Sequence, residues 1–419
     1  MASPTAPGPP VGQPDRQLSK HPAPGAEWPE RGLDLSALAA AGWRPVPIRE
    51  FVLKLTSRCD LACDHCYIYT MADQSWAAQP PVMTRRTIDQ AARRISEHTH
   101  THGLVRTRVV LHGGEPLLAG VEMIDFAARS IRRHVPGRTD IILQTNGVNL
   151  DHRFLKVMHT HGIRAGISLD GTAAAHDRHR RYRDGRGSHA ETARALRLLG
   201  APAHRELFAG LLCTVDLRND PLQVYQALLE FEPPAVDFLL PHGNWSSPPP
   251  ARAGIDGAPY ADWLGVIFDH WISAPRRETG VRLFEEIIHL LLGGQSSSEQ
   301  VGLSPVGFLV VETNGAVQQT DTLKAAHAGA PDLGLNIFDH PIDAALRHPA
   351  VAARQLGLLA LADDCRRCHV VSTCGGGHYP HRYRRGTGFR NPSVYCADLV
   401  QLIGHIRRAL STRLPVASR

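Results

Sequence analysis

The stretch Glu50-Phe-Val-Leu-Lys-Leu-Thr56-Ser-Arg-Cys59-Asp-Leu-Ala-Cys63-Asp-His-Cys66 joins a run of strand-forming residues to three closely spaced cysteines. The run predicts a β-strand over residues 50–56. Three thiolates on one tight loop can hold three irons of a four-iron cluster and leave the fourth iron without a protein ligand. A structural zinc site is the alternative, but it needs four protein ligands and usually shows paired short spacings. The spacing favours an iron-sulfur cluster with one open iron.

Strand-forming and helix-forming segments alternate from Arg49 onward, which is typical of βα units around a parallel sheet. We expect strands near residues 50–56, 107–112, 140–145, 164–169, 206–213 and 235–240. We expect helices near residues 84–100, 121–134, 151–161, 188–200, 220–230, 258–274 and 281–292. Six such units predict a partial (β/α)6 barrel, open on one side, whose ligands collect at the carboxyl ends of the strands.

The chain divides into four regions. Residues 1–47 begin with a proline- and alanine-dense stretch that we expect to be mostly disordered, and a short amphipathic piece over 33–41 predicts a docking helix, with a mere leader as the alternative. Residues 48–275 are assigned to the barrel. Residues 276–412 are assigned to a linker and a small loop-rich domain, and 413–419 to a tail.

Composition limits the classes of function. The 419 residues are 43% hydrophobic, enough for one large or two ordinary domains, and the net charge is +6. No basic run is interleaved with aromatic residues, so we expect no nucleic-acid binding, while a carboxylate-bearing peptide fits the mild positive charge. No apolar run is long enough for a membrane span and the start of the chain does not resemble a signal peptide, so we expect a cytoplasmic protein that does not bind membranes.

A second group of cysteines lies near the end of the chain. In a reducing cytosol disulfides are disfavoured, and four cysteines make a complete set for one metal site. By itself their spacing fits a zinc knuckle slightly better than an iron-sulfur cluster. Cys213 lies outside both groups, in an apolar run typical of a buried strand. The four grouped cysteines are Cys365, Cys368, Cys374 and Cys396.

Three polar motifs follow successive predicted strands. They are His112-Gly-Gly-Glu-Pro116, Gln144-Thr-Asn-Gly147 and Ser168-Leu-Asp-Gly171. Each alone is an ordinary turn motif. Together, in this order and behind the first cysteine loop, they resemble the radical S-adenosylmethionine (SAM) superfamily. The resemblance implies a [4Fe-4S] cluster whose open iron chelates the amino and carboxylate groups of SAM, held by Cys59, Cys63 and Cys66.

The same resemblance implies the contacts to SAM. Gly113 and Gly114 would grip its amino group, with Glu115 as the counter-charge, and Arg180 would meet its carboxylate. Reduction of the cluster would then cleave the sulfonium and give a 5'-deoxyadenosyl radical that removes a hydrogen atom from the substrate. The remaining implied contacts are His65 and Tyr67 near the adenine, Ser168 and Asp170 at the ribose or methionine, and Asn146 in its strand-end motif.

The second cysteine group resembles the SPASM domain, whose full form has seven cysteines and two auxiliary clusters. Here His378 stands at the place of one cysteine, and the segment before Asp321 lacks another. The resemblance implies one auxiliary [4Fe-4S] cluster bound by all four cysteines of the group, with backbone N–H groups of residues 375–377 near its sulfurs. It also implies a proton-accepting role for Asp321, with a solvated loop aspartate as the alternative.

Residues 67–76 and 381–396 resemble the FxsB-type peptide maturases. Several of these form three-residue cyclophanes in ribosomally made precursor peptides: a β-carbon radical adds to an aromatic ring two residues earlier, and one electron and one proton are then lost. The resemblance implies a precursor-peptide substrate and a flavodoxin- or ferredoxin-type electron donor. The alternatives are thioether formation, formylglycine-type oxidation and, more distantly, a non-catalytic metal-binding regulatory protein.

Overall fold

The computed structural model describes residues 27–29, 31–252 and 257–413. Within them the strands form one sheet of ten, in the order β10-β9-β8-β1-β2-β3-β4-β5-β6-β7. Strands β1 to β8 pair in parallel, whereas β9 and β10 are antiparallel. The strands are β1 (Glu50–Thr56), β2 (Arg106–Gly113), β3 (Arg138–Thr145), β4 (Ile163–Ser168), β5 (Phe208–Thr214), β6 (Ala235–Leu239), β7 (Gly280–Val281), β8 (Phe308–Val311), β9 (Ala316–Gln318) and β10 (Asp332–Asn336).

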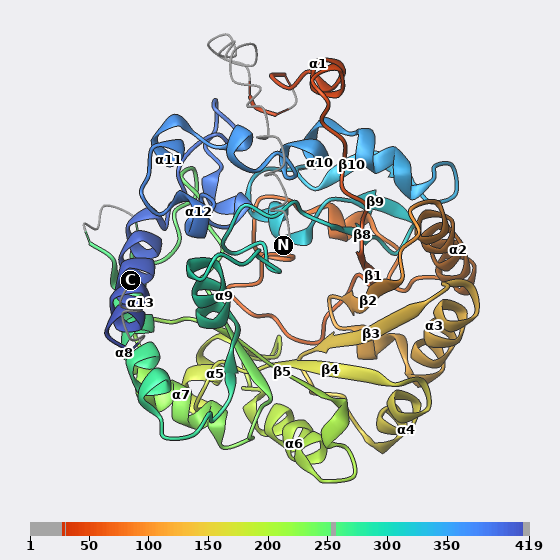
Figure 1. Ribbon diagram of the computed structural model, residues 1–419. Coiled ribbons are helices and arrows are strands. Elements are labelled where there is room, and N and C mark those ends of the chain that lie inside the picture. The colour runs from red at the N-terminus through yellow and green to blue at the C-terminus, as the bar shows by residue number, and fades with distance from the viewer. Residues whose placement is uncertain (1–26, 30, 253–256, 414–419) are drawn as a thin grey trace, which may run out of the picture.

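Helices surround the curved sheet on its outer side, and the arrangement is a partial barrel (Figure 1). The predicted α/β partial barrel of strand–helix units is thereby confirmed, and the structure adds helices α5 and α10 to α13 and strands β7 to β10 to the predicted elements. The helices are α1 (Leu35–Ala40), α2 (Arg85–Thr101), α3 (Val121–His134), α4 (His152–His161), α5 (Ala173–His179), α6 (His189–Gly200), α7 (Pro221–Leu229), α8 (Pro259–Ser273), α9 (Arg282–Leu291), α10 (Pro349–Ala353), α11 (Asp363–Arg366), α12 (Val371–Cys374) and α13 (Cys396–Arg413).

The helix boundaries have local causes. The side chains of Thr84, Asp151 and Asp220 accept hydrogen bonds from backbone N–H groups in the first turns of α2, α4 and α7. Such N-caps satisfy donors that have no partner within the helix. Helix α2 buries Ile88 and Ile95, two turns apart, against the sheet. The main core therefore lies between the sheet and the ring of helices.

The sheet crosses the predicted domain boundary between residues 275 and 276. Strand β8 lies after that boundary and pairs in parallel with β1, with Phe51 beside Leu309. Helix α13 packs along α8, and the Asp398 carboxylate accepts hydrogen bonds from the backbone N–H groups of Tyr260 (2.9 Å) and Ala261 (3.3 Å). The C-terminal region, shown in blue in Figure 1, is thus joined to the flank of the barrel.

The N-terminal region is described only in part. The helix predicted within residues 33–41 is present as α1, and its Leu38 is buried in a second apolar cluster with Trp28 and Leu323. Most of the predicted disordered stretch, residues 1–26, lies outside the described residues, as does the tail from residue 414. Among the helices of the described part of the chain, none is long and apolar enough to cross a membrane.

Phe51 tests the central position of β1. Its strand lies between β2 and β8, and its side chain is fully buried under α2, where it packs edge-on against His98. Phe51→Ala therefore removes a large apolar group from the core. We expect the free energy of unfolding to fall by about 3–5 kcal/mol in denaturant titrations followed by circular dichroism. The control is Val105→Ala, at a side chain that is 84% exposed, which should change stability by less than about 0.5 kcal/mol. Equal losses of stability in Phe51→Ala and Val105→Ala would contradict the central position of β1 in the core.

Candidate functional site

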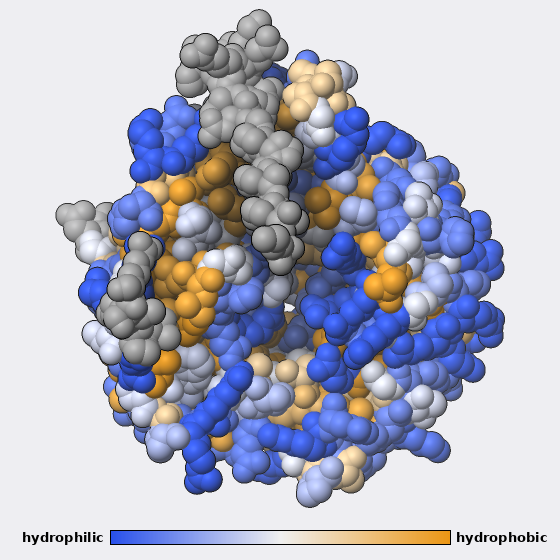
Figure 2. All heavy atoms as spheres, viewed as in Figure 1, coloured by the Kyte–Doolittle hydropathy of each residue, from blue (hydrophilic) through white to orange (hydrophobic). Residues whose placement is uncertain are grey.

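A pocket of about 960 Å³, part of it open to solvent, lies at the carboxyl ends of the parallel strands. Figure 2 shows this molecule hollowed near the centre of one face, inside the ring of helices. The wall combines the first cysteine loop with the ends of β2 to β6. It contains Cys59, Leu61, Cys63, His65, Cys66, Tyr67, Ile68, Tyr69, His112, Gly114, Glu115, Gln144, Thr145, Asn146, Ser168, Arg180, Leu212, Thr214, Leu239, Leu240, Pro241 and His242.

The three cysteines of the first group are free thiols on this wall. Burial raises the pKa of all three, and that of Cys63 reaches about 11 although the Arg180 guanidinium lowers it. Negative charge on Cys63 also raises the pKa of Cys59, and negative charge on Cys66 raises that of Cys63. Crowded, desolvated thiols are poor sites for bare thiolates but good ligands for a metal group that supplies positive charge. The donor set fits a cluster held by Cys59, Cys63 and Cys66.

Two glycines after β2 allow the cysteine loop to approach closely. A Cβ atom on Gly113 would collide with the backbone carbonyl of Thr56. One on Gly114 would collide with the Arg58 carbonyl and with the Tyr69 hydroxyl. Glycine is therefore required for the end of β2 to lie against the loop that carries the cysteines. Gly114 lines the pocket, whereas Gly113 lies behind it.

Glu115 connects the end of β2 to the end of β3. Its carboxylate accepts hydrogen bonds from the Thr145 hydroxyl (2.6 Å), the Asn146 backbone N–H (2.8 Å) and the Leu117 backbone N–H (3.0 Å). The side chain is buried, and desolvation raises its pKa to about 7 despite these donors. The Glu115 carboxyl in the pocket wall is therefore partly protonated at neutral pH, and a cation beside it would favour the ionised form.

Asn146 ties the same edge of the sheet to the cysteine loop. Its amide donates to the Asp60 carboxylate (2.8 Å), and Asn149 donates to the other oxygen of that carboxylate (2.6 Å). The Asn146 amide also lies 3.9 Å from the Cys59 sulfur. The predicted contact Ser168 lies on the next strand, where its hydroxyl accepts from Gln144 at 3.3 Å. These two predicted residues therefore share the pocket with the cysteines.

Asp170 and Arg180 form a buried ion pair. Arg180 donates to both carboxylate oxygens, at 2.7 and 3.1 Å, and the Thr214 backbone N–H donates to one of them at 2.9 Å. Burial opposes ionisation of Asp170, but Arg180 and then His65 lower its pKa well below the usual range. Arg180 lines the pocket and Asp170 lies behind it. Asp170 is thus placed to orient Arg180, and His65 lies 3.8 Å from the same carboxylate.

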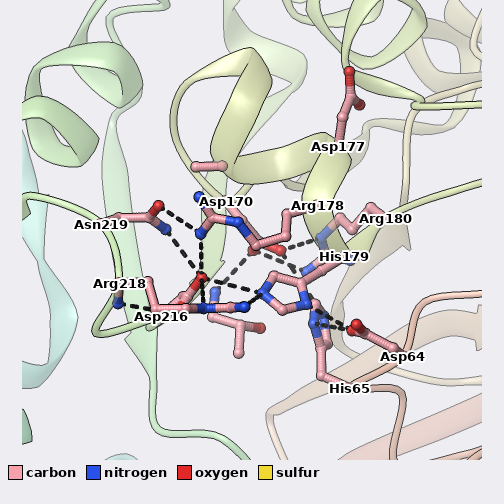
Figure 3. Close-up of polar contacts among 12 residues, drawn as sticks. Asp64, His65, Asp170, Asp177, Arg178, His179, Arg180, Asp216, Arg218 and Asn219 are labelled. Atoms are coloured by element: carbon pink, nitrogen blue, oxygen red, sulfur yellow. Dashed lines mark hydrogen bonds and ion pairs between the residues drawn. The ribbon is translucent and has the colours of Figure 1, made fainter.

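A polar network that sequence reasoning missed supports this corner (Figure 3). Asp216 accepts from Arg178 (2.6 Å) and Arg218 (2.9 Å), and lies 3.2 Å from one ring nitrogen of His179. The other ring nitrogen of His179 lies 2.7 Å from the Asp64 carboxylate in the cysteine loop. The network connects the loop after β5 to the cysteine loop. Charged residues in loops give no sequence signal for such partners.

A second buried charge cluster lies inside the barrel. Lys54 of β1 is 3.0 Å from the Asp321 carboxylate and 3.3 Å from that of Glu312, and all three side chains are buried. Lys324 lies 3.6 Å from Glu312 and 3.3 Å from Asp73. We call these five residues the lysine–carboxylate cluster. Sequence reasoning identified only Asp321 among them.

Asp321 lies close behind the pocket wall. Burial opposes its ionisation, but Lys54 and then Lys324 lower its pKa, so the group is a carboxylate at neutral pH. Burial and then the charge of Asp321 raise the pKa of Tyr67, and the same charge opposes the burial effect at His112. Tyr67 and His112 both line the pocket. The alternative of a solvated loop aspartate is wrong, because Asp321 is only 5% exposed.

The four cysteines of the second group surround a separate pocket of about 430 Å³. All four are free thiols, and burial raises the pKa of Cys374 to about 12. Helices α11, α12 and α13 each contribute one of the cysteines, and Cys368 follows α11. The donor set fits one metal group with four protein ligands. It contains Cys365, Cys368, Cys374 and Cys396.

Three consecutive glycines hold one side of this pocket. Residues 375–377 all have φ between 60° and 80°, a conformation that favours glycine. The buried Arg382 guanidinium donates to the carbonyls of Gly375 (2.7 Å), Gly376 (3.1 Å) and Gly377 (2.6 Å). With the carbonyls turned to Arg382, the Gly376 N–H is directed to the Cys374 sulfur and lowers its pKa against the larger effect of burial. This agrees with the expected N–H contact to a sulfur.

The lysine–carboxylate cluster predicts a large cost for removing its central cation. Lys54→Met keeps the side-chain length but leaves Asp321 and Glu312 without their nearest positive charge, so we expect a loss of about 3–5 kcal/mol in the free energy of unfolding. Denaturant titration measures it. Arg108→Ala is the matched control on the adjoining strand, since its ion pair with Glu50 is exposed and should contribute at most about 1 kcal/mol. A Lys54→Met loss no larger than the control's would refute the pairing.

Comparisons with known proteins agree with this geometry. Residues 53–201 match the radical SAM superfamily, and this range contains the first cysteine group and the three strand-end motifs. The chain is 22% identical over 382 residues to a serine-type anaerobic sulfatase-maturating enzyme of Bacteroides thetaiotaomicron, covering 86% of this chain and 89% of that one. A cysteine-type enzyme of Clostridium perfringens is 23% identical and covers 66% and 74%.

Two solved structures share the fold. Native anSMEcpe with bound AdoMet aligns with a TM-score of 0.76 at 20% identity, covering 87% of this chain and 98% of the other. Streptococcus suis SuiB bound to precursor peptide SuiA aligns with a TM-score of 0.56 at 12% identity, covering 86% and 78%. At these identities the likeness is one of fold. The match to the radical SAM superfamily covers residues 53–201, the part of the chain that carries the three thiols of the loop after β1 and the strand-end motifs. Members of that superfamily use SAM and a [4Fe-4S] cluster.

Proposed function

We propose that this chain is a radical SAM peptide maturase that forms a carbon-carbon crosslink between an aromatic ring and a nearby side-chain β-carbon. The observation that carries the proposal is the shared pocket, in which three thiols, Glu115 and Arg180 stand together with the lysine–carboxylate cluster directly behind. Both the maturase relatives and the peptide-bound neighbour SuiB support a peptide substrate. A cytosolic flavodoxin- or ferredoxin-type donor would supply the electron.

The residues on the wall divide into three roles. Cys59, Cys63 and Cys66 would bind the cluster, and Glu115 and Arg180 offer opposite charges to the ammonium and carboxylate of SAM. When bound, SAM and the reduced cluster supply hydrogen-atom abstraction. The apolar wall from Leu212, Leu239 and Leu240 would keep water away from the reacting carbon. The four cysteines near the C-terminus would hold the auxiliary [4Fe-4S] cluster.

Asp321 is the proposed proton acceptor. Crosslinking to an aromatic ring requires that the ring lose one electron and one proton after the carbon-carbon bond has formed. The auxiliary cluster would accept the electron. Asp321 is ionised at neutral pH and can take that proton at a carboxylate oxygen, while Lys54, at 3.0 Å, holds the side chain in place. Its low pKa makes it a weak base, which is sufficient for an acidic ring-carbon proton.

Formylglycine-type oxidation is the second candidate. It is favoured by the relatives, which are sulfatase-maturating enzymes matched over most of their length. That reaction also begins at a β-carbon and also requires a proton acceptor, so the same pocket and the same Asp321 would serve it. The products differ: the oxidation leaves an aldehyde, whereas the crosslink leaves a closed ring.

Glu115 predicts how SAM binding depends on pH. Its pKa of about 7 is raised above the value of a free glutamate, so the carboxyl is largely protonated below pH 7 and must lose its proton to pair with a cation. The dissociation constant for SAM should therefore rise by up to about tenfold per pH unit below 7. Calorimetry between pH 6 and 8 measures it. In Glu115→Gln the part of this pH dependence that comes from Glu115 should vanish, and only the part that comes from the amino group of SAM should remain. The same pH dependence in the variant and the unmodified chain would contradict the pairing of Glu115 with SAM.

Product analysis tests the reaction itself. The chain is co-expressed anaerobically with the small open reading frame beside its gene, and the peptide is analysed by mass spectrometry. A crosslink lowers the peptide mass by two hydrogens, and the joined residues no longer separate on fragmentation in the mass spectrometer. Because the crosslinked product contains no aldehyde, it should not react with hydroxylamine. A product that hydroxylamine traps would establish the formylglycine reaction instead, and an unmodified peptide would refute both.

Asp321→Asn is the matched variant for this assay. The substitution preserves shape but removes the proton acceptor, so the variant should still release 5'-deoxyadenosine from SAM while its crosslinked product falls by about 100-fold. Full product formation by this variant would remove Asp321 from the reaction.

A further inference from the structure

Three histidines converge beside the pocket without serving any role described above. His242 follows β6, and His378 and His381 lie after the glycines of residues 375–377. One ring nitrogen of each lies within 4.8 Å of the corresponding atoms of the other two. The ring centroids are 5.0 to 5.8 Å apart. Residues distant in sequence therefore present three imidazoles to one point.

Two of these rings have buried nitrogens without a hydrogen-bond partner. They are Nδ1 of His242 and Nε2 of His381, and the His381 side chain is almost wholly buried, at 3% exposed. A buried polar atom without a partner destabilises the folded protein, and a bound ligand would remove that cost. Burial lowers the pKa of His242 to about 3 and that of His381 well below its usual range, so both rings are neutral. Neutral imidazoles with free lone pairs are metal ligands.

The surroundings hold the rings in place. Tyr67 packs edge-on against His242 with centroids 4.7 Å apart, and Tyr395 packs against His381 at 4.9 Å. Nε2 of His378 lies 3.8 Å from the Glu299 carboxylate. A carboxylate beside one ring nitrogen of a histidine is the usual outer support of a histidine ligand, because it orients the ring and raises the basicity of the other nitrogen.

We propose that His242, His378 and His381 bind a divalent transition-metal ion, separate from both cysteine groups. Imidazole ligands suit Zn²⁺, Fe²⁺, Ni²⁺ and Cu²⁺. Three imidazoles leave the fourth position of a tetrahedral ion for water or a substrate oxygen. His242 also lines the main pocket, so the ion would stand at the edge of the space proposed for the peptide. There it would bind a carboxylate or carbonyl of the substrate.

The described residues contain an internal comparison. His98, His102 and Asp343 form a second group of possible ligands. There the ring nitrogens are already paired: His102 lies 3.1 Å from the Asp343 carboxylate, and His98 contacts both that carboxylate and the Ile48 carbonyl. A group whose nitrogens are satisfied within the protein gains little from a metal. The free nitrogens distinguish the His242 group from this one.

Zinc binding to the cluster-loaded protein tests the proposal. The chain is purified anaerobically with its iron and sulfide complete, so that the cysteines are occupied, and titrated with Zn²⁺ in equilibrium dialysis. We expect one tight equivalent. X-ray absorption at the zinc edge should show three imidazoles at about 2.0–2.1 Å and no sulfur. Zinc bound by sulfur, or no bound equivalent, would overturn the proposal.

Single variants locate the ion. His242→Gln and His378→Gln are both at partly exposed positions, and each should weaken zinc binding by about 100-fold or more. Loss of a residue that only supports a metal ligand weakens binding by about 10- to 100-fold, so a direct ligand should cost at least the upper end of that range. His102→Gln should leave it unchanged. Iron and sulfide content, measured in every variant, shows whether the fold is intact. Should one variant lose its clusters, the other variant and the absorption spectrum of the unmodified chain still decide. Unchanged zinc binding in a variant with intact clusters would refute the site.

Discussion

The buried pairing of Lys54 with Asp321 and Glu312 is the constraint on which the rest of the site depends. Lys54 belongs to β1, the strand that leads directly into the first cysteine loop, and its two partners come from the segment around β8 and β9. A charge inside a barrel is tolerated only when opposite charges meet it closely. The pairing therefore requires that the C-terminal region close against β1, and this closure also brings Asp321 behind the pocket.

Charge is divided between two sides of the pocket. On one side, near the cysteines, Arg180 in the pocket wall forms an ion pair with Asp170 behind the wall. On the other, Lys54 and Lys324 meet three carboxylates. Each buried charge has a counterpart, so the pocket can present single charged groups to a ligand without leaving a bare charge in the core. Glu115 is held differently, by neutral donors alone, and its proton affinity is correspondingly higher.

The fold could be predicted well because its signals are local. Alternating strand and helix runs indicated the βα units, and the cysteine spacing with the strand-end motifs indicated which edge of the sheet carries the chemistry. Short strands escaped prediction: β7 has two residues and β9 has three, too few to show a period. The pairing of β8 with β1, over a separation of more than two hundred residues, has no local signal either.

The sequence by itself determined the donor types and their spacing: three cysteines on one loop, four more near the end, and polar motifs after three successive strands. Only the tertiary structure decided what each of them meets. Asp170 meets Arg180 and stands behind the wall, Asp321 meets Lys54, and three histidines from two distant segments share one point. The reason is physical: ligand spacing within a loop is set by the covalent chain, whereas the partner of a buried charge is set by how distant segments pack.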